Sequence, residues 1–595
     1  MIITFLIAAG GASIVLRLLR LPNTWESWTG ALLTGYCFAS AVILAIGSFN
    51  IRAACSIWIT LAAISMIGFA LPKTKRLSLP QIDLSAQSFS GLDKISLLAI
   101  FMAFLSGVLV SFAPVTSWDA GVAHLALPAA YWREERIAAM PLDNYSLYPQ
   151  LMHTLFAIAP PGLRESHASG TVLFMSLALC SSTFWLARRI AGPACGLPAA
   201  AMIATTPLFL EHHAVPEIDI PYTATVVAAL SALAAWRQEK NYGWLVLAGL
   251  LAGSGCGIRH TAYLAGALML TGVFFVARER RWYSASVFAA VASASAAPWL
   301  LRTALICGNP VYPFFTSILG ANAAPDIDVA AIGAHSSIQG SHFAQLISFP
   351  WSLAMNPKHY GGWDTSPGVL WLVLGVLGIA AGGRGARMLG AFGGAGLVAI
   401  FFFQRFARYA FPFIAPLFAV AAVPLETLPR LRRAVGMAMI VSYAFGLGPS
   451  MAVMASKLPV VFGLQSRDAY LAARIERYPA MLWVSQNLAD DARILSLDPR
   501  GYYFDRRTVT NFEALKSISG LDYAGQREWL RKNGVTHLFY SEQYRQSPAF
   551  RATRVGAMID GWRADTEHFA IIKQFDLPNP RVGGTERVEI YEFKP

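Results

Sequence analysis

The sequence predicts an all-α polytopic membrane protein that carries a C-terminal soluble α/β domain. Of its 595 residues, 55% are hydrophobic and only 14% are charged, whereas soluble domains are about 25% charged. A helix that crosses a bilayer needs roughly 20 mainly apolar residues, and many such runs occur before residue 455. These observations exclude a disordered chain, a fibrous protein and an ordinary cytosolic enzyme.

The apolar runs predict about 14 transmembrane helices. We expect them near 2–19, 28–48, 51–71, 94–114, 169–187, 191–209, 220–236, 243–258, 261–277, 282–300, 368–384, 388–404, 410–426 and 434–453. Lys and Arg cluster after alternate runs, at 73–76, 188–189, 237–240, 278–281, 384–387 and 430–433. Basic loops face the cytoplasm, so both ends of the chain are expected outside. Most of the net charge of +13 thus reflects topology and not nucleic-acid binding.

Three long segments are left on the outer face, at about 115–168, at about 301–367 and from 456 onward. The first contains semi-apolar stretches typical of amphipathic helices that lie in the membrane interface, AGVAHLALPAAYW and YPQLMHTLFAIA. We therefore divide the chain into N-terminal helices (1–93), a membrane core (94–455) and an outer domain (456–595).

The outer domain is expected to be a small α/β fold. Its helix-like segments are 468–488 and 524–534, the second ending at Gly534, and its strand-like segments are 492–498, 535–541, 568–577 and 586–593. The stretch DPRGYYFDRR is rich in Tyr and Arg, so it could contact carbohydrate or form an ordinary domain surface.

The first outer loop carries an acidic residue close to the membrane. Asp119 follows a span by a few residues, with Trp118 beside it. A carboxylate at that depth costs free energy unless it is paired or functional. An aromatic neighbour is, by contrast, an ordinary interfacial anchor. We interpret Asp119 as a functional residue.

A second acidic loop, EHHAVPEIDIPYT, holds Glu211, His212, His213, Glu217 and Asp219 within nine residues. Such a set could bind a divalent ion or could be a solvated loop. The six cysteines form no CxxC pair, so no thiolate zinc site is indicated. The sequence requires no cofactor, and the metal question stays open.

Three turns on the outer face carry arginine, against the positive-inside bias. They are GIRHTA with Arg259, PWLLRTALICGNPVYPFF with Arg302, and QRFARYAFP with Arg408. Snorkelling explains any one such residue, but guanidinium groups also bind phosphate bidentately. Together, an acidic group and several arginines at one interface suit group transfer from a lipid phosphate. The carboxylate would act as general base, and the arginines would stabilise the departing phosphate.

These segments, in this order, resemble the GT-C superfamily of polyprenyl-phosphate-sugar glycosyltransferases. The chain is most similar to the bacterial family 39-like group, which includes the lipid A aminoarabinose transferase and protein O-mannosyltransferases. The resemblance rests on DAGVAHLALPAAYWREERI, YSLYPQL, EIDIPYTA, WLVLAGLLAGSGCGIRHTA, PWLLRTALICGNPVYPFF and QRFARYAFP, which cover about 100–430.

The resemblance implies the GT-C fold, a periplasmic active site in the bacterial inner membrane and a polyprenyl-phosphate-linked sugar as donor. It implies that Asp119 is the catalytic base and Asp219 an auxiliary carboxylate. The expected donor-phosphate ligands are Arg259, Arg302 and Arg408. The residues expected to contact the substrates are His124, Tyr131, Tyr145, Glu217, His260, Gln404 and Tyr409.

The sequence departs from these relatives at Ala123, His153 and His260, where they often have Tyr, Glu and Tyr. These changes leave the sugar and the acceptor open. The acceptor is a cell-envelope hydroxyl on a lipid, glycan or protein, and direct attack predicts inversion at the anomeric carbon. Alternatives are a transferase that moves a whole glycan, a flippase for a lipid-linked sugar, or a membrane scaffold.

Overall fold

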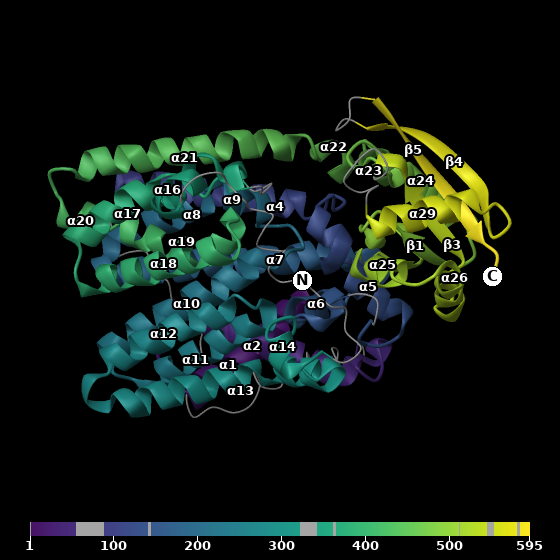
Figure 1. The fold of residues 1–595 in the computed structure, drawn as a ribbon. Helices are drawn as coiled ribbons and strands as arrows, with labels where there is room; N and C mark the ends of the chain where they lie inside the picture. The colour runs from purple at the N-terminus through teal and green to yellow at the C-terminus, as the bar shows by residue number, and fades with distance from the viewer. Residues whose placement is uncertain are drawn as a thin grey trace.

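The computed structural model describes residues 2–54, 89–140, 144–321, 342–360, 365–510, 512–543, 553–579 and 584–595. The predicted span at 51–71 lies mostly outside these residues. Long helices run back and forth through one bundle, and a smaller domain with a sheet covers one end of it (Figure 1). The all-α membrane protein with a C-terminal α/β domain is therefore confirmed.

The bundle follows the predicted order of apolar runs. Its helices are α1 (Ile2–Leu18), α2 (Trp25–Gly47), α4 (Gly91–Val110), α7 (Arg164–Ala191), α8 (Gly196–Ala204), α9 (Pro207–His212), α10 (Asp219–Glu239), α11 (Tyr242–Ile258), α12 (Ala262–Val276), α13 (Arg281–Cys307), α17 (Leu370–Ala381), α18 (Arg384–Phe403), α19 (Ala407–Ala421), α20 (Pro424–Thr427) and α21 (Arg432–Ala455). Within the described residues, eight helices are long and apolar enough to cross a membrane, and five more apolar helices are shorter.

One predicted span is broken in the structure. The run expected at 191–209 forms α8 and α9, which are separated at Thr205 and Thr206. The Thr206 side chain accepts a hydrogen bond from the N–H of Phe209, and Pro207 occupies the first turn of α9. Proline lacks the N–H that would continue α8, and its fixed φ suits the start of a new helix.

The first outer segment forms short helices that are buried in the protein. They are η1 (Ala120–His124), α5 (Ala126–Arg133), η2 (Asn144–Leu147), α6 (Leu151–Phe156) and η3 (Pro161–Leu163). All six side chains of α6 are buried, as is Tyr131 on α5. These stretches are short helices rather than spans, and α6 packs against α2 and α7.

The second outer segment contributes α14 (Thr316–Leu319), α16 (His342–Met355) and the turn η6 (Pro357–Tyr360).

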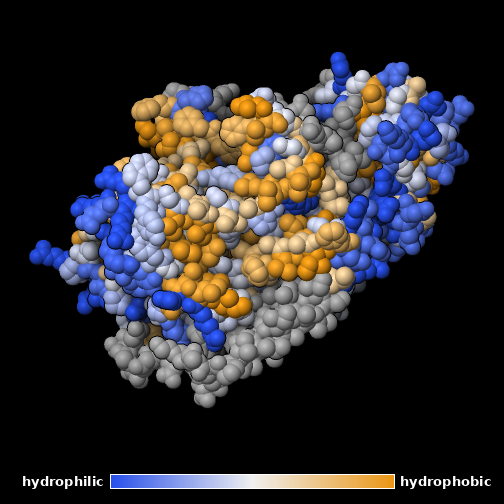
Figure 2. Space-filling model, turned by 90° about the horizontal axis from the view of Figure 1, so that it is seen from below, coloured by the Kyte–Doolittle hydropathy of each residue, from blue (hydrophilic) through white to orange (hydrophobic). Residues whose placement is uncertain are grey.

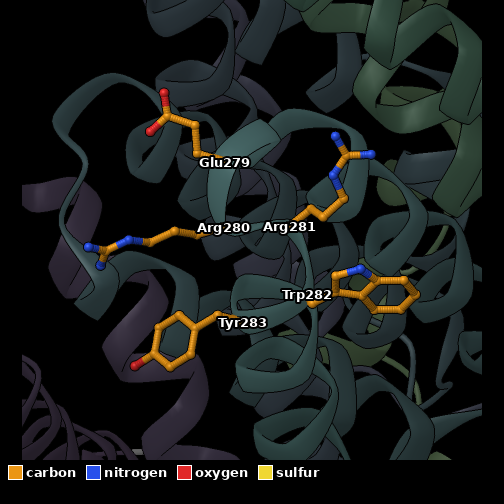
Figure 3. A pocket seen from close by; sticks show the side chains of 5 residues that line it. All are labelled: Glu279, Arg280, Arg281, Trp282 and Tyr283. Carbon is orange, nitrogen blue, oxygen red and sulfur yellow. The ribbon is translucent and has the colours of Figure 1, made fainter.

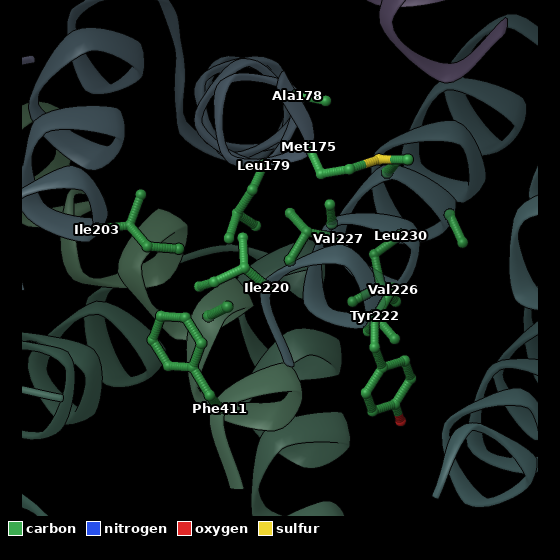
Figure 4. Close-up of a cluster of buried hydrophobic side chains, with 14 of the residues drawn as sticks. Met175, Ala178, Leu179, Ile203, Ile220, Tyr222, Val226, Val227, Leu230 and Phe411 are labelled. Atoms are coloured by element: carbon green, nitrogen blue, oxygen red, sulfur yellow. The ribbon is translucent and has the colours of Figure 1, made fainter. Parts of the chain in front are cut away.

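The most buried spans are α10 and α19. Apolar side chains from α7, α8, α10 and α19 meet in one cluster, in which Leu179, Ile203, Val227 and Phe411 are close neighbours (Figure 4). Lipid tails are as apolar as these side chains, so close packing between the helices, rather than removal from water, holds them together within the membrane. The two central helices therefore offer rigid positions at their ends.

The outer domain holds a five-stranded mixed sheet of order β2-β1-β3-β5-β4. Strands β1 (Arg493–Ser496), β2 (Arg507–Val509) and β3 (His537–Ser541) are parallel, and β4 (Phe569–Asn579) and β5 (Gly584–Phe593) complete it antiparallel. The helices are α22 (Leu458–Val461), α23 (Arg467–Ala472), α24 (Tyr478–Asn487), α25 (Phe512–Ser519), α26 (Tyr523–Lys532) and α29 (Arg554–Ala564), and the turn η7 is Gly501–Phe504. Gly534 follows α26 with φ +63°, as expected for a helix C-terminus.

The surface of the bundle has the pattern expected of a protein that crosses a membrane. A broad hydrophobic zone lies across the bundle, between hydrophilic residues at its two ends (Figure 2). A hollow of about 400 Å³ lies at the α12–α13 hairpin, lined by Glu279, Arg280, Arg281, Trp282 and Tyr283 (Figure 3). This hairpin lies at the end of the bundle away from the outer domain (Figure 1).

Candidate active site

The predicted acidic and basic residues come from helix ends at one end of the bundle. Asp119 directly precedes η1, a short π-helical turn, which is a conformation frequent at functional sites. Asp219 is the first residue of α10, where the helix dipole favours a negative charge. Arg259 ends α11 as its C-cap, and Arg408 lies in the first turn of α19. This end of the bundle faces the outer domain (Figure 1).

Each carboxylate is paired with one arginine. Arg408 Nη1 donates to Asp119 Oδ2, and Arg259 Nη1 donates to Asp219 Oδ1. The Asp219 and Arg259 side chains are 3% and 14% exposed, whereas those of Asp119 and Arg408 are 32% and 20% exposed. The Asp219–Arg259 pair is therefore the structural one, and the Asp119–Arg408 pair is open to an incoming molecule.

Tyr409 joins the two ion pairs. The Arg259 guanidinium carbon lies 3.8 Å from the centre of the Tyr409 ring, and that of Arg408 lies 5.4 Å from it. A cation over an aromatic face is stabilised by the ring quadrupole. Two positive groups on one ring also repel each other, so the cluster favours a nearby anion. The two aspartates fill that role here.

Glu217 connects the two acidic loops. Its Oε1 accepts a hydrogen bond from the Ser117 hydroxyl, two residues before Asp119. Its Oε2 lies 2.5 Å from His212 Nδ1. Burial alone would lower the pKa of His212, but the charge of Glu217 and its hydrogen bond outweigh burial and raise it to about 10. The same pairing holds the pKa of Glu217 well below its usual value.

A histidine pair lies beside this cluster. His124 Nδ1 and His153 Nε2 are 2.9 Å apart and share one hydrogen bond. Burial lowers the pKa of both rings, and for His124 the surrounding carboxylates of Asp119, Glu217 and Asp219 partly oppose it. The pKa of His153 is lowered further by the charges of His124 and Arg302. Both rings are therefore neutral near pH 7.

Some of the predicted site residues make their contacts in a separate group. Arg302 donates from Nη1 to the carbonyl of Ser146 over 2.8 Å, and the Tyr131 hydroxyl donates to Gln150 Oε1 over 2.8 Å. Arg302 acts electrostatically on His153, whereas Arg259 and Arg408 lie over the ring of Tyr409.

Three other predicted contact residues have mainly aromatic or helix-capping roles. The ring of His260 packs against Tyr148 and Phe314, with centroids 5.2 and 5.4 Å away. Tyr145 packs edge-on against the same Tyr148 ring at 5.7 Å. Gln404 is the C-cap of α18. The ion pairs of Asp119 and Asp219 are made by Arg408 and Arg259 and not by these three residues.

The side chains of the acidic loop are divided among several partners. Glu211 accepts hydrogen bonds from the N–H and hydroxyl of Thr365, and His213 lies against the carbonyls of Leu210 and Ala103. His212 lies between Glu217 and Glu211, with its Nε2 3.7 Å from Glu211 Oε2, whereas Asp219 pairs with Arg259. Over the described part of the chain, no group of three or more His, Cys, Asp and Glu is arranged to hold a metal ion.

Sequence reasoning alone does not place Ser117 in this site, and it identifies His153 only as a departure from relatives. It identifies His212 as a candidate metal ligand and not as the partner of Glu217. One signal was available: Ser117 and Glu217 each stand two residues before an aspartate, and they are bonded to each other.

Comparison with known proteins agrees with this architecture. The family described as dolichyl-phosphate-mannose-protein mannosyltransferase matches residues 162–301. No curated protein matches the chain. Among solved structures, ArnT from Cupriavidus metallidurans bound to undecaprenyl phosphate aligns with a TM-score of 0.51 at 15% identity, over 84% of this chain and 97% of that one. AglB from Archaeoglobus fulgidus, in complex with an inhibitory peptide and a dolichol-phosphate, aligns with a TM-score of 0.47 at 15% identity, over 84% and 74%.

The protein is therefore a multi-pass membrane protein of the GT-C glycosyltransferase fold. Its fold is similar to that of the ArnT structure, as the resemblance of its outer-face motifs predicted.

Proposed function

We propose that this chain is a membrane glycosyltransferase that moves a sugar from a polyprenyl-phosphate donor to an acceptor hydroxyl. The observation that carries the proposal is the pairing of each outer-face carboxylate with an arginine, with both arginines on one tyrosine ring. Support for the lipid comes from the fold, because the ArnT structure holds undecaprenyl phosphate.

Arg408 and Arg259 would bind the donor phosphate. Guanidinium groups bind phosphate oxygens bidentately, and the ring of Tyr409 holds both groups on one side. When the phosphate binds, it competes with Asp119 for Arg408, because that pair is the more exposed one. Asp219 stays with Arg259 and keeps this arginine oriented. The lipid phosphate thus releases the carboxylate that the reaction needs.

Asp119 then acts as general base. The acceptor oxygen attacks the anomeric carbon as its proton passes to Asp119, and the bond from that carbon to the phosphate oxygen breaks. The bonding electrons leave on the phosphate, where the two arginines stabilise the new charge. Attack opposite the leaving group inverts the anomeric centre.

Glu217 would hold the two halves of this site together. It binds Ser117 from the Asp119 loop, and it is fixed by the protonated His212 from the loop before Asp219. The neutral His124 and His153 lie next to this cluster and could donate or accept hydrogen bonds to sugar hydroxyls.

The topology supports a placement of the site on the outer side of the membrane. Site and outer domain share one end of the bundle, and the basic hairpin at 278–281 lies at the other end. With basic loops on the cytoplasmic side, the site faces the periplasm of a bacterial inner membrane. The core at 94–455 is then the catalytic domain, and 456–595 is a periplasmic domain.

Binding of undecaprenyl phosphate to the purified chain tests the phosphate site. We expect Arg408→Gln to weaken binding at least tenfold. Arg405→Gln is the matched control, because Arg405 lies on the same turn but contacts Phe401 and Gln345. Equal affinities for the two variants would contradict the assignment.

Turnover in detergent, with a lipid extract of the native membranes as donor source, separates the alternatives. Transfer of one sugar, seen in the product mass, supports the proposal. A product heavier by a whole glycan indicates an oligosaccharyl transferase. The absence of turnover in every extract indicates a flippase or a scaffold and contradicts the proposal.

A further inference from the structure

The outer domain touches the loop that carries Asp119. The turn η7 places Tyr503 against this loop, and its hydroxyl donates to the carbonyl of Val115 over 2.8 Å. The Tyr503 ring lies so close to Gly121 that a Cβ added there would be 2.8 Å from the ring. Asp119 stands between the two contact points in the sequence. The aromatic turn is therefore buried against the loop and is neither a carbohydrate platform nor an ordinary surface.

A second contact holds the same stretch of backbone. The N–H of Val115 donates to Glu165 over 3.1 Å. Glu165 accepts from the hydroxyl of Tyr502 over 2.8 Å and forms an ion pair with Arg467, and both of these residues belong to the outer domain. Both backbone polar groups of Val115 are thus fixed, one by Tyr503 itself and the other by a carboxylate that the outer domain holds.

A third contact reaches the residue beside Asp119. The Arg500 guanidinium lies over the ring of Trp118, 4.9 Å from its centre. Arg500 is itself rigid, since it donates to Asp498 from Nε over 3.0 Å and from Nη2 over 2.7 Å. Asp498 also accepts from Arg477 over 2.7 Å, and these three side chains are buried. The outer domain thus presents a fixed surface to the loop.

Further hydrogen bonds continue these contacts into the outer domain on one side and into the membrane bundle on the other. Arg477 continues the network to Glu586 on β5 over 2.8 Å, so the sheet itself anchors the turn. On the membrane side, Ser117 is held by Glu217. The loop from Val115 to Gly121 is therefore fixed at its two ends by the outer domain and in its middle by the acidic loop.

We infer that Arg500, Tyr502 and Tyr503 of the outer domain are positioning residues that set the location of Asp119. The inference rests on the proposed function, because it assigns the outer domain a part in the same active site. The domain does not contact the reacting atoms through these residues. It acts by fixing the backbone on both sides of the base, so that the acceptor proton and the carboxylate meet in the right geometry.

Hydrogen exchange tests this inference without any substrate. In Tyr503→Phe, which keeps the ring and removes only the hydroxyl, we expect faster exchange in peptides covering 113–124 and unchanged exchange in α10 and α19. Tyr523→Phe is the control, because the Tyr523 hydroxyl bonds to Asp565 within the outer domain. If Tyr503→Phe does not fold, Tyr502→Phe serves as the second variant.

Turnover provides a readout that a merely structural role would not move. We expect Tyr503→Phe to lower kcat on the order of tenfold, with unchanged KM for the lipid-linked donor and unchanged affinity for undecaprenyl phosphate. Unchanged exchange in 113–124, or kcat equal to that of the control, would overturn the inference. Faster exchange in 113–124 together with full turnover by Asp119→Asn would instead contradict the proposed function and leave the loop contact standing.

Discussion

The buried pair of Asp219 and Arg259 makes a measurable prediction about where the lipid phosphate binds. In Asp219→Asn the guanidinium of Arg259 keeps its charge but loses its carboxylate. Breaking one side of a buried ion pair costs about 3–5 kcal/mol, and both side chains here are at most 14% exposed. The variant should therefore unfold at a clearly lower temperature than the wild type.

The phosphate of undecaprenyl phosphate should restore much of this loss, because it supplies the missing anion. A ligand at 100 times its Kd stabilises the folded state by about 2.7 kcal/mol. Since Arg259 is no longer shared with Asp219, the variant should also bind the lipid more tightly than the wild type does. Its apparent Tm should then rise more on lipid addition.

The control is Glu26→Gln at the other end of the bundle. Glu26 pairs with Arg189, and their side chains are 6% and 16% exposed. Arg189 also pairs with Glu239, so the initial loss of stability should be smaller, and the comparison is of the rise in Tm on lipid addition. Differential scanning fluorimetry of both variants, with and without undecaprenyl phosphate, is the assay. If lipid raised the Tm of Glu26→Gln as much as that of Asp219→Asn, the reasoning that Arg259 binds the phosphate would be wrong.

Three further predictions concern the Tyr409 ring, the pair of His212 and Glu217, and the packing of α11 against α13. Tyr409→Leu should weaken undecaprenyl phosphate binding by about 0.5–2 kcal/mol, or roughly 2- to 30-fold, because Arg259 loses its aromatic support; isothermal titration measures this. The pairing of His212 with Glu217 raises the pKa of His212 from 6.5 to about 10. The stability that this pair contributes is therefore complete below pH 6.5 and is lost as the pH rises toward 10. The Tm of His212→Gln, measured by thermal unfolding, should lack this decline with pH. Gly253→Ala should lower the Tm, because a Cβ there would lie 2.0 Å from a carbonyl oxygen of α13, and an unchanged Tm would contradict the close approach of α11 and α13.

The membrane architecture could be predicted because bilayer thickness fixes the length of apolar runs. The ends of α10, α11 and α19 lie near their predicted positions. The sequence could therefore place Asp219, Arg259 and Arg408 on the same side of the membrane. Their pairing could not be predicted. Asp119 and Arg408 are 289 residues apart, and only the packing of α19 in the centre of the bundle brings them into contact.

Other parts of the structure gave weak sequence signals. Strand β2 has three residues, too few to show an alternating pattern. Helix α29 contains Gly556 and Gly561, and glycine lowers helix propensity by about 1 kcal/mol. The sequence predicts a turn at Arg302, but this residue lies within α13, and its guanidinium donates to the carbonyl of Ser146. An arginine near the end of an apolar run indicates a position near the interface and does not indicate its partner.

The contact of the outer domain with the Asp119 loop also could not be predicted from the sequence. The residues of DPRGYYFDRR are those of a sugar-binding surface, and composition alone could not separate that use from a domain contact. The structure places Tyr503 on Val115 and Gly121. Aromatic side chains with a hydroxyl can bury the ring and satisfy a backbone carbonyl at once, which is what an interdomain contact requires.

Single-turnover transfer by Asp119→Asn, measured beside its affinity for undecaprenyl phosphate, tests the central claim most directly. The side chain keeps its size but cannot accept the acceptor proton. We expect sugar transfer to be abolished, while the lipid phosphate binds at least as tightly as to the wild type because Arg408 is no longer paired with a carboxylate. Transfer at the wild-type rate by the folded variant would contradict the assignment of Asp119 as the base.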